Sequence, residues 1–193
     1  MILKENTSQQ KLRGAYYTPL PLAEKIVEYF KNDISLKTVI EPSCGDGVFF
    51  DALINQKIIA SLQNLTGIEI EKDETEKLAA KLSAYTNIQI QNADFFDFYK
   101  KNSDKERYDL ILGNPPYIRY QYLSESQRRE MSVILTSHKM KSNKLINTWV
   151  AFVVACVHLL SENGKIAFVI PAEILQVAYA EDLRIYLSKN LSN

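Results

Sequence analysis

The chain has 193 residues, of which 46% are hydrophobic and 24% are charged, the balance of a soluble globular protein that can bury a core. Its 23 basic and 23 acidic side chains leave no net charge, so the whole chain lacks the basic excess that phosphate binding usually produces. The most apolar stretch, residues 149–160, is too short to cross a bilayer, so we expect one cytoplasmic domain without a membrane span. Two cysteines are too few for a disulfide framework and two histidines lack zinc-ligand spacing, so we expect reduced thiols and no metal.

Charge is distributed unevenly along the chain. Residues 119–144 hold six basic and two acidic side chains, a local charge of +4. Taken alone, such a run is typical of a solvated loop or helix face. The basic residues are Arg119, Arg128, Arg129, Lys139, Lys141 and Lys144.

The first half of the chain predicts helices and strands that alternate. Apolar residues at helical spacing over residues 19–32, with a proline near the first turn, predict an amphipathic helix. KTVIEPS predicts a short buried strand, and the loop SCGDG leads into a helix over residues 48–54. LTGIEI predicts a second strand, and residues 73–85, which open with acidic side chains, predict a helix.

The second half continues this alternation. NIQIQNAD and RYDLILGNP predict the third and fourth strands. Residues 146–160 are apolar on nearly every side and predict a helix that lies deep against a sheet. We expect Gly164 to stop that helix before a fifth strand, and residues 180–190 predict a last helix. The pattern indicates an α/β fold with a doubly wound, mostly parallel sheet, whose ligands lie at the carboxyl ends of the strands.

The loop after the first strand suits a cationic ligand. Gly45 and Gly47 let the backbone turn tightly and approach a ligand closely. Glu41 and Asp46 would repel the pyrophosphate of a dinucleotide at this helix N-terminus, but they suit the sulfonium and ammonium groups of S-adenosylmethionine. A plain strand-to-helix turn explains the GDG sequence equally well.

Acidic residues at the next two strand ends extend this hypothesis. Glu69 follows the glycine loop by 24 residues, near the offset of about 20 at which an acid accepts hydrogen bonds from ribose hydroxyls. Glu71 is an alternative for that role. Asp94 is placed to accept from an adenine amino group, with Phe95 or Phe96 against the ring. A strand-end cap for Asp94 and ordinary core positions for the phenylalanines remain open.

The strongest motif is Asn114, Pro115, Pro116, Tyr117, after the fourth strand. An amino group conjugated to a purine is a poor nucleophile because its lone pair is delocalised into the ring. The Asn114 side-chain oxygen and the Pro115 carbonyl can each accept one N–H and free the lone pair for attack on a methyl group. Two prolines hold both acceptors in place before the substrate arrives, and Tyr117 offers a face for stacking on the base.

Together these motifs resemble the gamma-type N6-adenine DNA methyltransferases, which carry an NPPY motif and include enzymes fused to or paired with restriction endonucleases. The match is ordered along the chain, through GAYYTP, EPSCGDGVFF, GIEIEKD, NADFFDF and LGNPPYIRY. The resemblance implies S-adenosylmethionine as cofactor and double-stranded DNA as substrate, with the target adenine extruded from the duplex. The cofactor-binding residues it implies are Tyr17, Thr18, Glu41, Ser43, Gly45, Gly47, Glu69, Ile70, Asp94 and Phe95.

The resemblance also implies a domain organisation. Residues 1–193 form one methyltransferase catalytic domain, with an N-terminal arm over residues 1–20 and a mobile basic loop over about 118–146 that lies beside the DNA. The sequence ends before the antiparallel strand pair that completes the family's sheet, and it lacks a target-recognition domain. We expect the open sheet edge to favour self-association, and an endonuclease or specificity subunit as a partner.

Two other functions remain open. NPPY also occurs in enzymes that methylate glutamine in release factors and in some RNA methyltransferases. These enzymes usually lack the Glu-Pro pair at the start of the glycine motif EPSCGDGVFF, and they usually lack the GAYYTP element. A non-catalytic module that binds cofactor or DNA within a restriction complex is the second alternative, and an intact NPPY argues against it.

Overall fold

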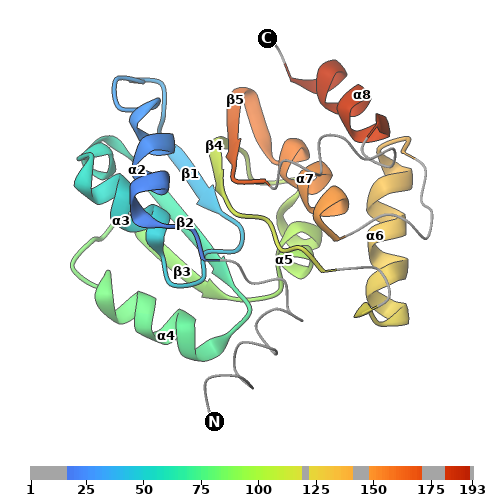
Figure 1. The fold of residues 1–193 in the computed structure, drawn as a ribbon, viewed down its shortest axis with the longest axis horizontal. Coiled ribbons are helices and arrows are strands. Elements are labelled where there is room, and N and C mark those ends of the chain that lie inside the picture. The colour runs from blue at the N-terminus through green and yellow to red at the C-terminus, as the bar shows by residue number, and fades with distance from the viewer. Residues whose placement is uncertain (1–16, 119–121, 141–147, 171–180, 192–193) are drawn as a thin grey trace. The chain divides into compact units, whose positions relative to one another are not determined.

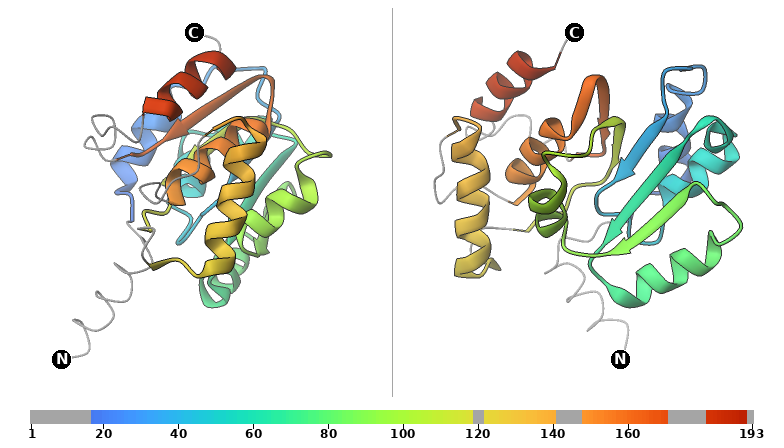
Figure 2. Two further views of the ribbon diagram at one scale, coloured as in Figure 1. Left: turned by 90° about the vertical axis from the view of Figure 1, so that its right-hand side faces the viewer. Right: turned by 180° about the vertical axis from the view of Figure 1, so that it is seen from behind.

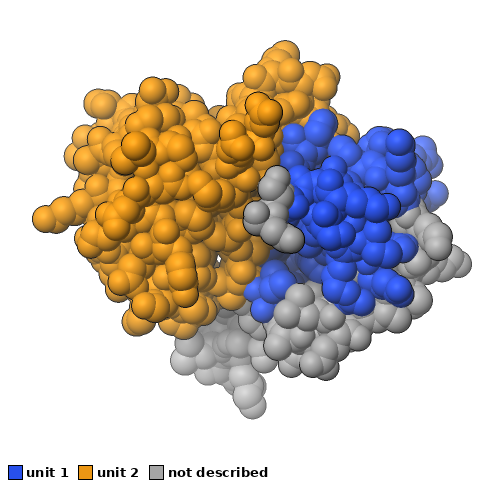
Figure 3. All heavy atoms as spheres, turned by 90° about the horizontal axis from the view of Figure 1, so that it is seen from above, with its two compact units in different colours: residues 1–16, 115–158, 170–193 blue, residues 17–114, 159–169 orange. Residues whose placement is uncertain are grey.

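The computed structural model describes residues 17–118, 122–140, 148–170 and 181–191 (Figure 1). The chain divides into two compact units, which are coloured separately in Figure 3. The sheet unit consists of residues 17–114 and 159–169, and the helical unit of residues 1–16, 115–158 and 170–193.

The sheet unit contains five parallel strands in the order β3-β2-β1-β4-β5. Successive strands are added to one side up to β3 and then to the other side from β4, so β1 and β4 flank the topological switch point, where ligands of open α/β sheets bind. The predicted parallel, doubly wound sheet is confirmed in the described residues. The strands are β1 Thr38–Glu41, β2 Asn64–Glu69, β3 Ile88–Asn92, β4 Tyr108–Gly113 and β5 Leu160–Phe168.

Helices cover both faces of this sheet. One face packs against α2 (Leu20–Glu28), α3 (Val48–Asn55) and α4 (Lys72–Lys81) around a shared apolar core. A 3-10 turn, η1 (Ile58–Ser61), follows α3, and α5 (Phe95–Asn102) lies on the opposite side of the sheet from α2 and α3 (Figure 2). Burial of each large apolar side chain contributes about 1.5–3 kcal/mol. The core includes Val27, Phe50, Leu53, Leu65 and Leu110, all with no exposed surface.

Helix α5 was not predicted from the sequence. Asp94 is its N-cap, and the Asp94 Oδ1 accepts hydrogen bonds from the backbone N–H groups of Phe96 and Asp97, at 2.8 and 3.3 Å. Short helices owe most of their stability to such caps and to burial of one face. From the sequence, Asp94 was expected to bind a ligand or to cap a strand end, and its role in starting a helix was overlooked.

The expected helix stop at Gly164 is wrong. Helix α7 ends at His158, and β5 begins at Leu160, so Gly164 lies inside the strand. A Cβ atom at this position would lie 2.7 Å from the Tyr108 carbonyl oxygen, where the pairing of β4 with β5 is irregular. Glycine is needed here because the two backbones approach closely, as is typical of bulged strands.

The helical unit contains α6 (Glu125–Ser137), α7 (Thr148–His158) and α8 (Glu181–Asn190), and α7 contacts both other helices. Every residue of α7 from Thr148 to Val157 is buried, so the predicted burial of this helix is confirmed. Helix α6 corrects the prediction of a loop over about residues 118–146. Its signals are a capping box between Ser124 and Gln127 and an apolar stripe that buries Met131, Ile134 and Leu135.

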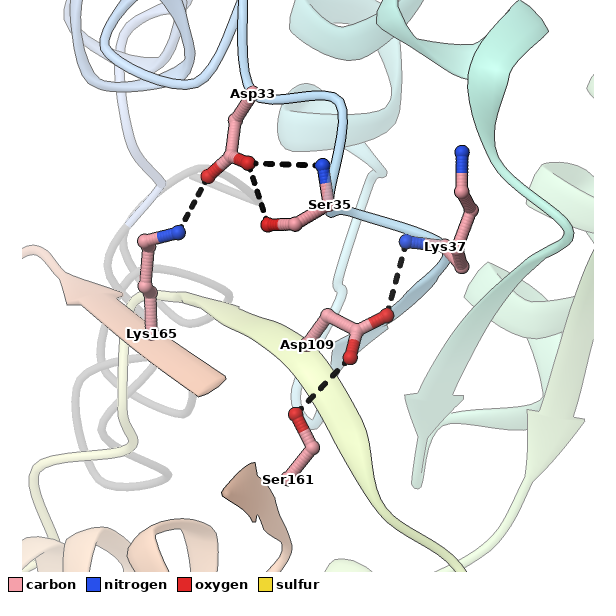
Figure 4. A network of polar contacts seen from close by, with 6 residues as sticks. All are labelled: Asp33, Ser35, Lys37, Asp109, Ser161 and Lys165. Atoms are coloured by element: carbon pink, nitrogen blue, oxygen red, sulfur yellow. Dashed lines mark hydrogen bonds and ion pairs between the residues drawn. The ribbon is translucent and has the colours of Figure 1, made fainter. Parts of the chain in front are cut away.

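A polar network fastens the amino ends of the strands, opposite the predicted site (Figure 4). Asp109 of β4 accepts from the Lys37 backbone N–H at 2.9 Å and from the Ser161 hydroxyl of β5 at 3.0 Å. Burial opposes ionisation of Asp109, but these hydrogen bonds outweigh it and lower the pKa of the carboxyl group. Asp33, whose pKa is lowered by its bond to Lys165, joins the segment after α2 to β5. The strands around the switch point are therefore tied together at the end away from the site.

Two predictions from composition can be compared with the structure. Cys44 and Cys156 are buried free thiols, as expected. Among the described residues, no helix has both the length and the apolarity to cross a membrane. Of the residues singled out from the sequence, Arg119, Lys141 and Lys144 lie outside the described ranges.

Candidate functional site

The glycine loop connects β1 to α3 by a tight turn that few sequences allow. Gly47 is the N-cap of α3 with a φ of 81°, in the left-handed region, and a Cβ atom here would lie 2.3 Å from the Leu78 Cδ1. The loop is closed by a hydrogen bond from the Gly47 N–H to the Cys44 carbonyl, at 2.8 Å. The Cys44 N–H donates in turn to the Ile68 carbonyl of β2, at 3.0 Å. The loop backbone is therefore held at the carboxyl ends of β1 and β2.

The Glu69 carboxylate joins this loop to the turn after β2. One oxygen accepts from the Gly45 N–H and the other from the Glu71 N–H, both at 2.8 Å. Glu69 is 9% exposed at the end of its strand, whereas Glu71 is exposed and serves as the N-cap position of α4. The structure thus separates two acids that the sequence left interchangeable. Glu69 lies at the strand end, next to the glycine loop.

Glu41 is a buried acid at the switch point. It ends β1 with 2% of its surface exposed, and its Oε2 has no hydrogen-bond partner among the described residues. A Cβ atom on Gly113 would lie 3.4 Å from the Glu41 Cγ, so the end of β4 lies beside this carboxyl group. Burial, reinforced by the charges of Asp46 and Glu69, raises the pKa of Glu41 well above its ordinary value. Such a group is matched by a ligand that brings a positive charge and N–H donors.

Tyr17 lies over the glycine loop. A Cβ atom on Gly45 would lie 3.9 Å from the Tyr17 Cε1, and the Tyr17 side chain is 53% exposed. Its pKa is raised by burial and by the charges of Glu74, Asp46 and Glu69. The surroundings of the loop are therefore negative, which disfavours a phosphate-bearing ligand and favours a cationic one.

Asn114 follows β4 and is held by two residues of the sheet unit. Its Nδ2 donates to the Thr18 Oγ1 at 3.3 Å, and its backbone carbonyl accepts from the Ser43 hydroxyl at 3.2 Å. Thr18 is 8% exposed. The sequence analysis placed Thr18 and Ser43 against the cofactor and missed their bonds to Asn114, because 96 and 71 residues separate the partners.

The rest of the catalytic motif begins the helical unit. Burial raises the pKa of the Tyr117 hydroxyl, which keeps it protonated at neutral pH. The next residue, Ile118, offers its carbonyl to Thr148 at the start of α7. The Thr148 N–H donates to that oxygen at 3.2 Å and the Thr148 Oγ1 at 3.0 Å. Thr148 is 3% exposed, so this pair of hydrogen bonds is protected from water. No sequence signal indicated the contact.

The remaining predicted cofactor residues differ in exposure. Asp94 caps α5, whereas the alternative left open from the sequence was a strand-end cap. Both of its bonds to backbone N–H groups are made by one oxygen. Phe95 is 6% exposed, whereas Ile70, directly after β2, is 61% exposed.

Three of the basic residues belong to α6 or its end. Arg129 is 80% exposed and lies 3.9 Å from Glu125, a weak surface ion pair. Arg128 is half-buried on the same helix. Lys139 follows the helix with a φ of 61°, in the left-handed position that closes a Schellman motif, with the Met140 N–H bonded to the Leu135 carbonyl at 2.9 Å.

Comparison with known proteins defines first the class and then the family. A structure described as a class I S-adenosylmethionine-dependent methyltransferase from Listeria monocytogenes matches 88% of this chain and 50% of its own, with a TM-score of 0.67 and 10% identity. The type I restriction-modification methyltransferase subunit from Streptococcus thermophilus matches 91% of this chain and 39% of its own, with a TM-score of 0.70 and 20% identity. The fold is that of S-adenosylmethionine-dependent methyltransferases.

Sequence similarity then identifies the family. The pattern of the Eco57I restriction-modification methylases matches residues 21–193, so the chain belongs to this family. The type II methyltransferase M.AccI from Acinetobacter calcoaceticus is 30% identical over 94% of this chain and 32% of its own length. The chain spans about a third of the length of such relatives. S-adenosylmethionine is the cofactor of this family and fold.

Proposed function

We propose that this protein transfers a methyl group from S-adenosylmethionine to the N6 amino group of adenine in double-stranded DNA, as the modification enzyme of a restriction-modification system. The observation that carries the proposal is the placement of Asn114. Its amide follows β4 at the switch point, in the same unit as the buried carboxyl group of Glu41. One strand end offers a site for a cation, and its neighbour offers an acceptor for an amine.

The acidic loop fits the cofactor. The Glu41 Oε2 is a buried acceptor for an ammonium group. The pKa of this carboxyl group is raised in the protein alone, and a bound positive charge would lower it again and favour the carboxylate. Glu69 is placed to accept from ribose hydroxyls, while the exposed Ile70 and Tyr17 give apolar surface to the rest of the molecule. Asp94 and Phe95 are proposed to bind the adenine. When bound, S-adenosylmethionine supplies an electrophilic methyl group on a sulfonium.

Asn114 and Pro115 make the target nitrogen reactive. The Nδ2 of Asn114 donates to Thr18, so the oxygen of the amide is the atom that serves as acceptor. This oxygen and the Pro115 carbonyl each accept one N–H of the target amine, which localises its lone pair. Because Thr18 and Ser43 hold the side chain and backbone of Asn114, the acceptors are oriented before the substrate binds. The methylated amine is acidic and loses its proton to water.

A base inside a duplex is out of reach of this site, so the adenine must be extruded, at a cost of a few kcal/mol. Tyr117 is proposed to recover part of this cost by stacking on the base. Arg128, Arg129 and Lys139, together with the basic residues outside the described ranges, are proposed to contact phosphates. The proposal also includes an endonuclease or specificity subunit as partner and a cytoplasmic location.

The test is transfer of a labelled methyl group from S-adenosylmethionine to plasmid DNA, total RNA and release factor, offered separately. We expect label in DNA as N6-methyladenine, and a hundredfold to thousandfold lower rate in Asn114→Ala, roughly the effect of removing a transition-state hydrogen-bond partner. Affinity for S-adenosylhomocysteine should stay within twofold of wild type. Asn55→Ala, an exposed asparagine that bonds to Glu24, serves as the control and should keep full activity.

Each other outcome contradicts a defined part of the proposal. Label in RNA or in glutamine would keep the chemistry of Asn114 and refute the DNA substrate. Cofactor binding without transfer to any substrate would support a non-catalytic module. Label at a cytosine amino group would refute adenine as the target base and would leave the rest of the proposal intact.

A further inference from the structure

Asn92 is the last residue of the edge strand β3, and its side-chain amide binds the backbone at the end of the neighbouring strand β2. Its Nδ2 donates to the Glu69 carbonyl and to the Ile70 carbonyl, both at 3.0 Å. It also lies 3.3 Å from the Oγ1 of Thr75, a residue in the first half of α4 that is 7% exposed. Asn92 is the first residue of the NADFFDF motif, but no role was predicted for it or for Thr75.

The hydrogens of this cluster can be assigned. An amide has two N–H groups, and the two carbonyls at 3.0 Å are their best acceptors. The Thr75 hydroxyl has one hydrogen, and its shorter contact is with the Glu71 carbonyl at 3.0 Å, whereas the Glu69 carbonyl is 3.3 Å away. Asn92 thus anchors residues 69 and 70, and Thr75 anchors residue 71, so every residue of the turn between β2 and α4 is held.

These bonds select one backbone conformation at the turn. In an extended strand, consecutive carbonyl groups point in opposite directions, so two of them can meet one amide only where the chain leaves the strand. The conformation they select is the one that directs the Glu71 N–H to the Glu69 carboxylate, whose other oxygen holds Gly45. The same turn presents Ile70, which is 61% exposed.

We propose that Asn92 and Thr75 are positioning residues of the cofactor site, which set the Glu69 carboxylate and the Ile70 side chain for S-adenosylmethionine. The pair acts through the backbone of the turn and touches no substrate. This inference rests on the cofactor assignment within the proposed function and is independent of the DNA substrate.

Asn87 provides a matched control at the other end of the same strand. Its Nδ2 also donates to two carbonyls, those of Ile59 and Leu62, at 3.0 Å each. It lies just before β3, at the amino end, away from the glycine loop. A substitution of Asn87 therefore breaks the same kind of bonds, and a comparison of the two asparagines separates support of the fold from support of the site.

The experiment measures affinity for S-adenosylhomocysteine by titration calorimetry and thermal stability without ligand, in Asn92→Asp and Asn87→Asp. Aspartate has the same size but turns an oxygen toward two carbonyl oxygens. We expect both variants to lose stability, and Asn92→Asp alone to lose affinity, by about tenfold, as two hydrogen bonds of ordinary strength allow. Thr75→Val should lose affinity about threefold, and Thr75→Ser, which keeps the hydroxyl, should restore it.

The outcomes are distinct. Equal affinity in the two aspartate variants, whether unchanged or lowered together, would reduce Asn92 to a structural role and overturn the inference. If affinity in Thr75→Ser is as low as in Thr75→Val, the Thr75 hydroxyl does not support cofactor binding. Absence of binding to the wild-type protein would overturn both this inference and the cofactor assignment, whereas binding without methylation of DNA would overturn the proposed substrate alone.

Discussion

The two units hold their functional residues in different ways. In the sheet unit, the glycine loop, Glu69 and the turn after β2 are connected by hydrogen bonds among three parallel strands. In the helical unit, the Ile118 carbonyl accepts two hydrogen bonds from Thr148 of α7. The residues proposed to bind the cofactor are therefore held by the sheet, and the backbone after Tyr117, proposed to stack on the target base, is held by α7.

The units also differ in charge. In the sheet unit, burial raises the pKa of Glu41, and the nearby charges of Asp46 and Glu69 raise it further. In the helical unit, residues 115–158 hold six basic and two acidic side chains. The difference suits a cationic cofactor in the sheet unit and the polyanionic substrate proposed for the helical unit.

The largest effect is expected at Glu41, the buried carboxyl group of the sheet unit. Glu41→Gln should lower affinity for S-adenosylhomocysteine by about a hundredfold, because it removes a charge-assisted bond to the ammonium group. Without ligand, the same variant should melt at a higher temperature than wild type at neutral pH. Calorimetry and thermal unfolding measure the two effects, and Glu76→Gln, on the surface of α4, is the control.

The pH dependence follows from the sign of the shift. The folded-state pKa of Glu41 lies well above the ordinary value of 4.5, so its contribution to stability is complete below that value and is lost as pH rises through the folded-state pKa. The advantage of Glu41→Gln should therefore grow with pH and vanish near pH 4. Cofactor binding should release a proton, seen as a dependence of the binding enthalpy on the buffer. An advantage that is constant with pH would contradict this account.

A smaller effect is expected in the helical unit from Thr148→Val. Valine keeps the size of threonine and the backbone N–H but removes the hydroxyl that donates to Ile118. We expect kcat to fall fivefold to tenfold with unchanged affinity for the cofactor, because the catalytic loop loses one buried hydrogen bond. Trp149, the single tryptophan of the chain, is buried at the next position, so its fluorescence reports on the start of α7.

Thr148→Ser is the matched variant and should restore kcat. A parallel loss of cofactor affinity in Thr148→Val would contradict the expectation that this hydrogen bond in the helical unit is independent of cofactor binding in the sheet unit.

The smallest effect is expected at the end of α6. Lys139→Gly should raise the free energy of unfolding by about 1 kcal/mol, because glycine adopts the left-handed conformation without the clash of a Cβ atom. If Lys139 contacts phosphate, the salt dependence of DNA binding should weaken by about one charge. Lys139→Ala loses the charge and keeps the clash, so urea unfolding should distinguish it from glycine. Equal stability of the two variants would refute the conformational argument.

The sequence by itself determined the five strands, the α/β class and the position of the NPPY motif after the fourth strand, because apolar runs and their glycine and proline boundaries are local signals. The capping box of α6 is also a local signal, but the resemblance to the family led to the prediction of a loop over this segment. Helix α5 was overlooked for a related reason, since Asp94 and its phenylalanines suited a ligand as well as a helix start.

The tertiary structure decided which residues act together. The bonds from Asn114 to Thr18, from Thr148 to Ile118 and from Asn92 to the turn after β2 join residues 96, 30 and up to 23 positions apart. Hydrogen bonds of this kind depend on strand order and register, which no local pattern of residues specifies. The burial of Glu41 is likewise a property of the sheet, because its carboxyl group is enclosed only when β1 and β4 lie side by side.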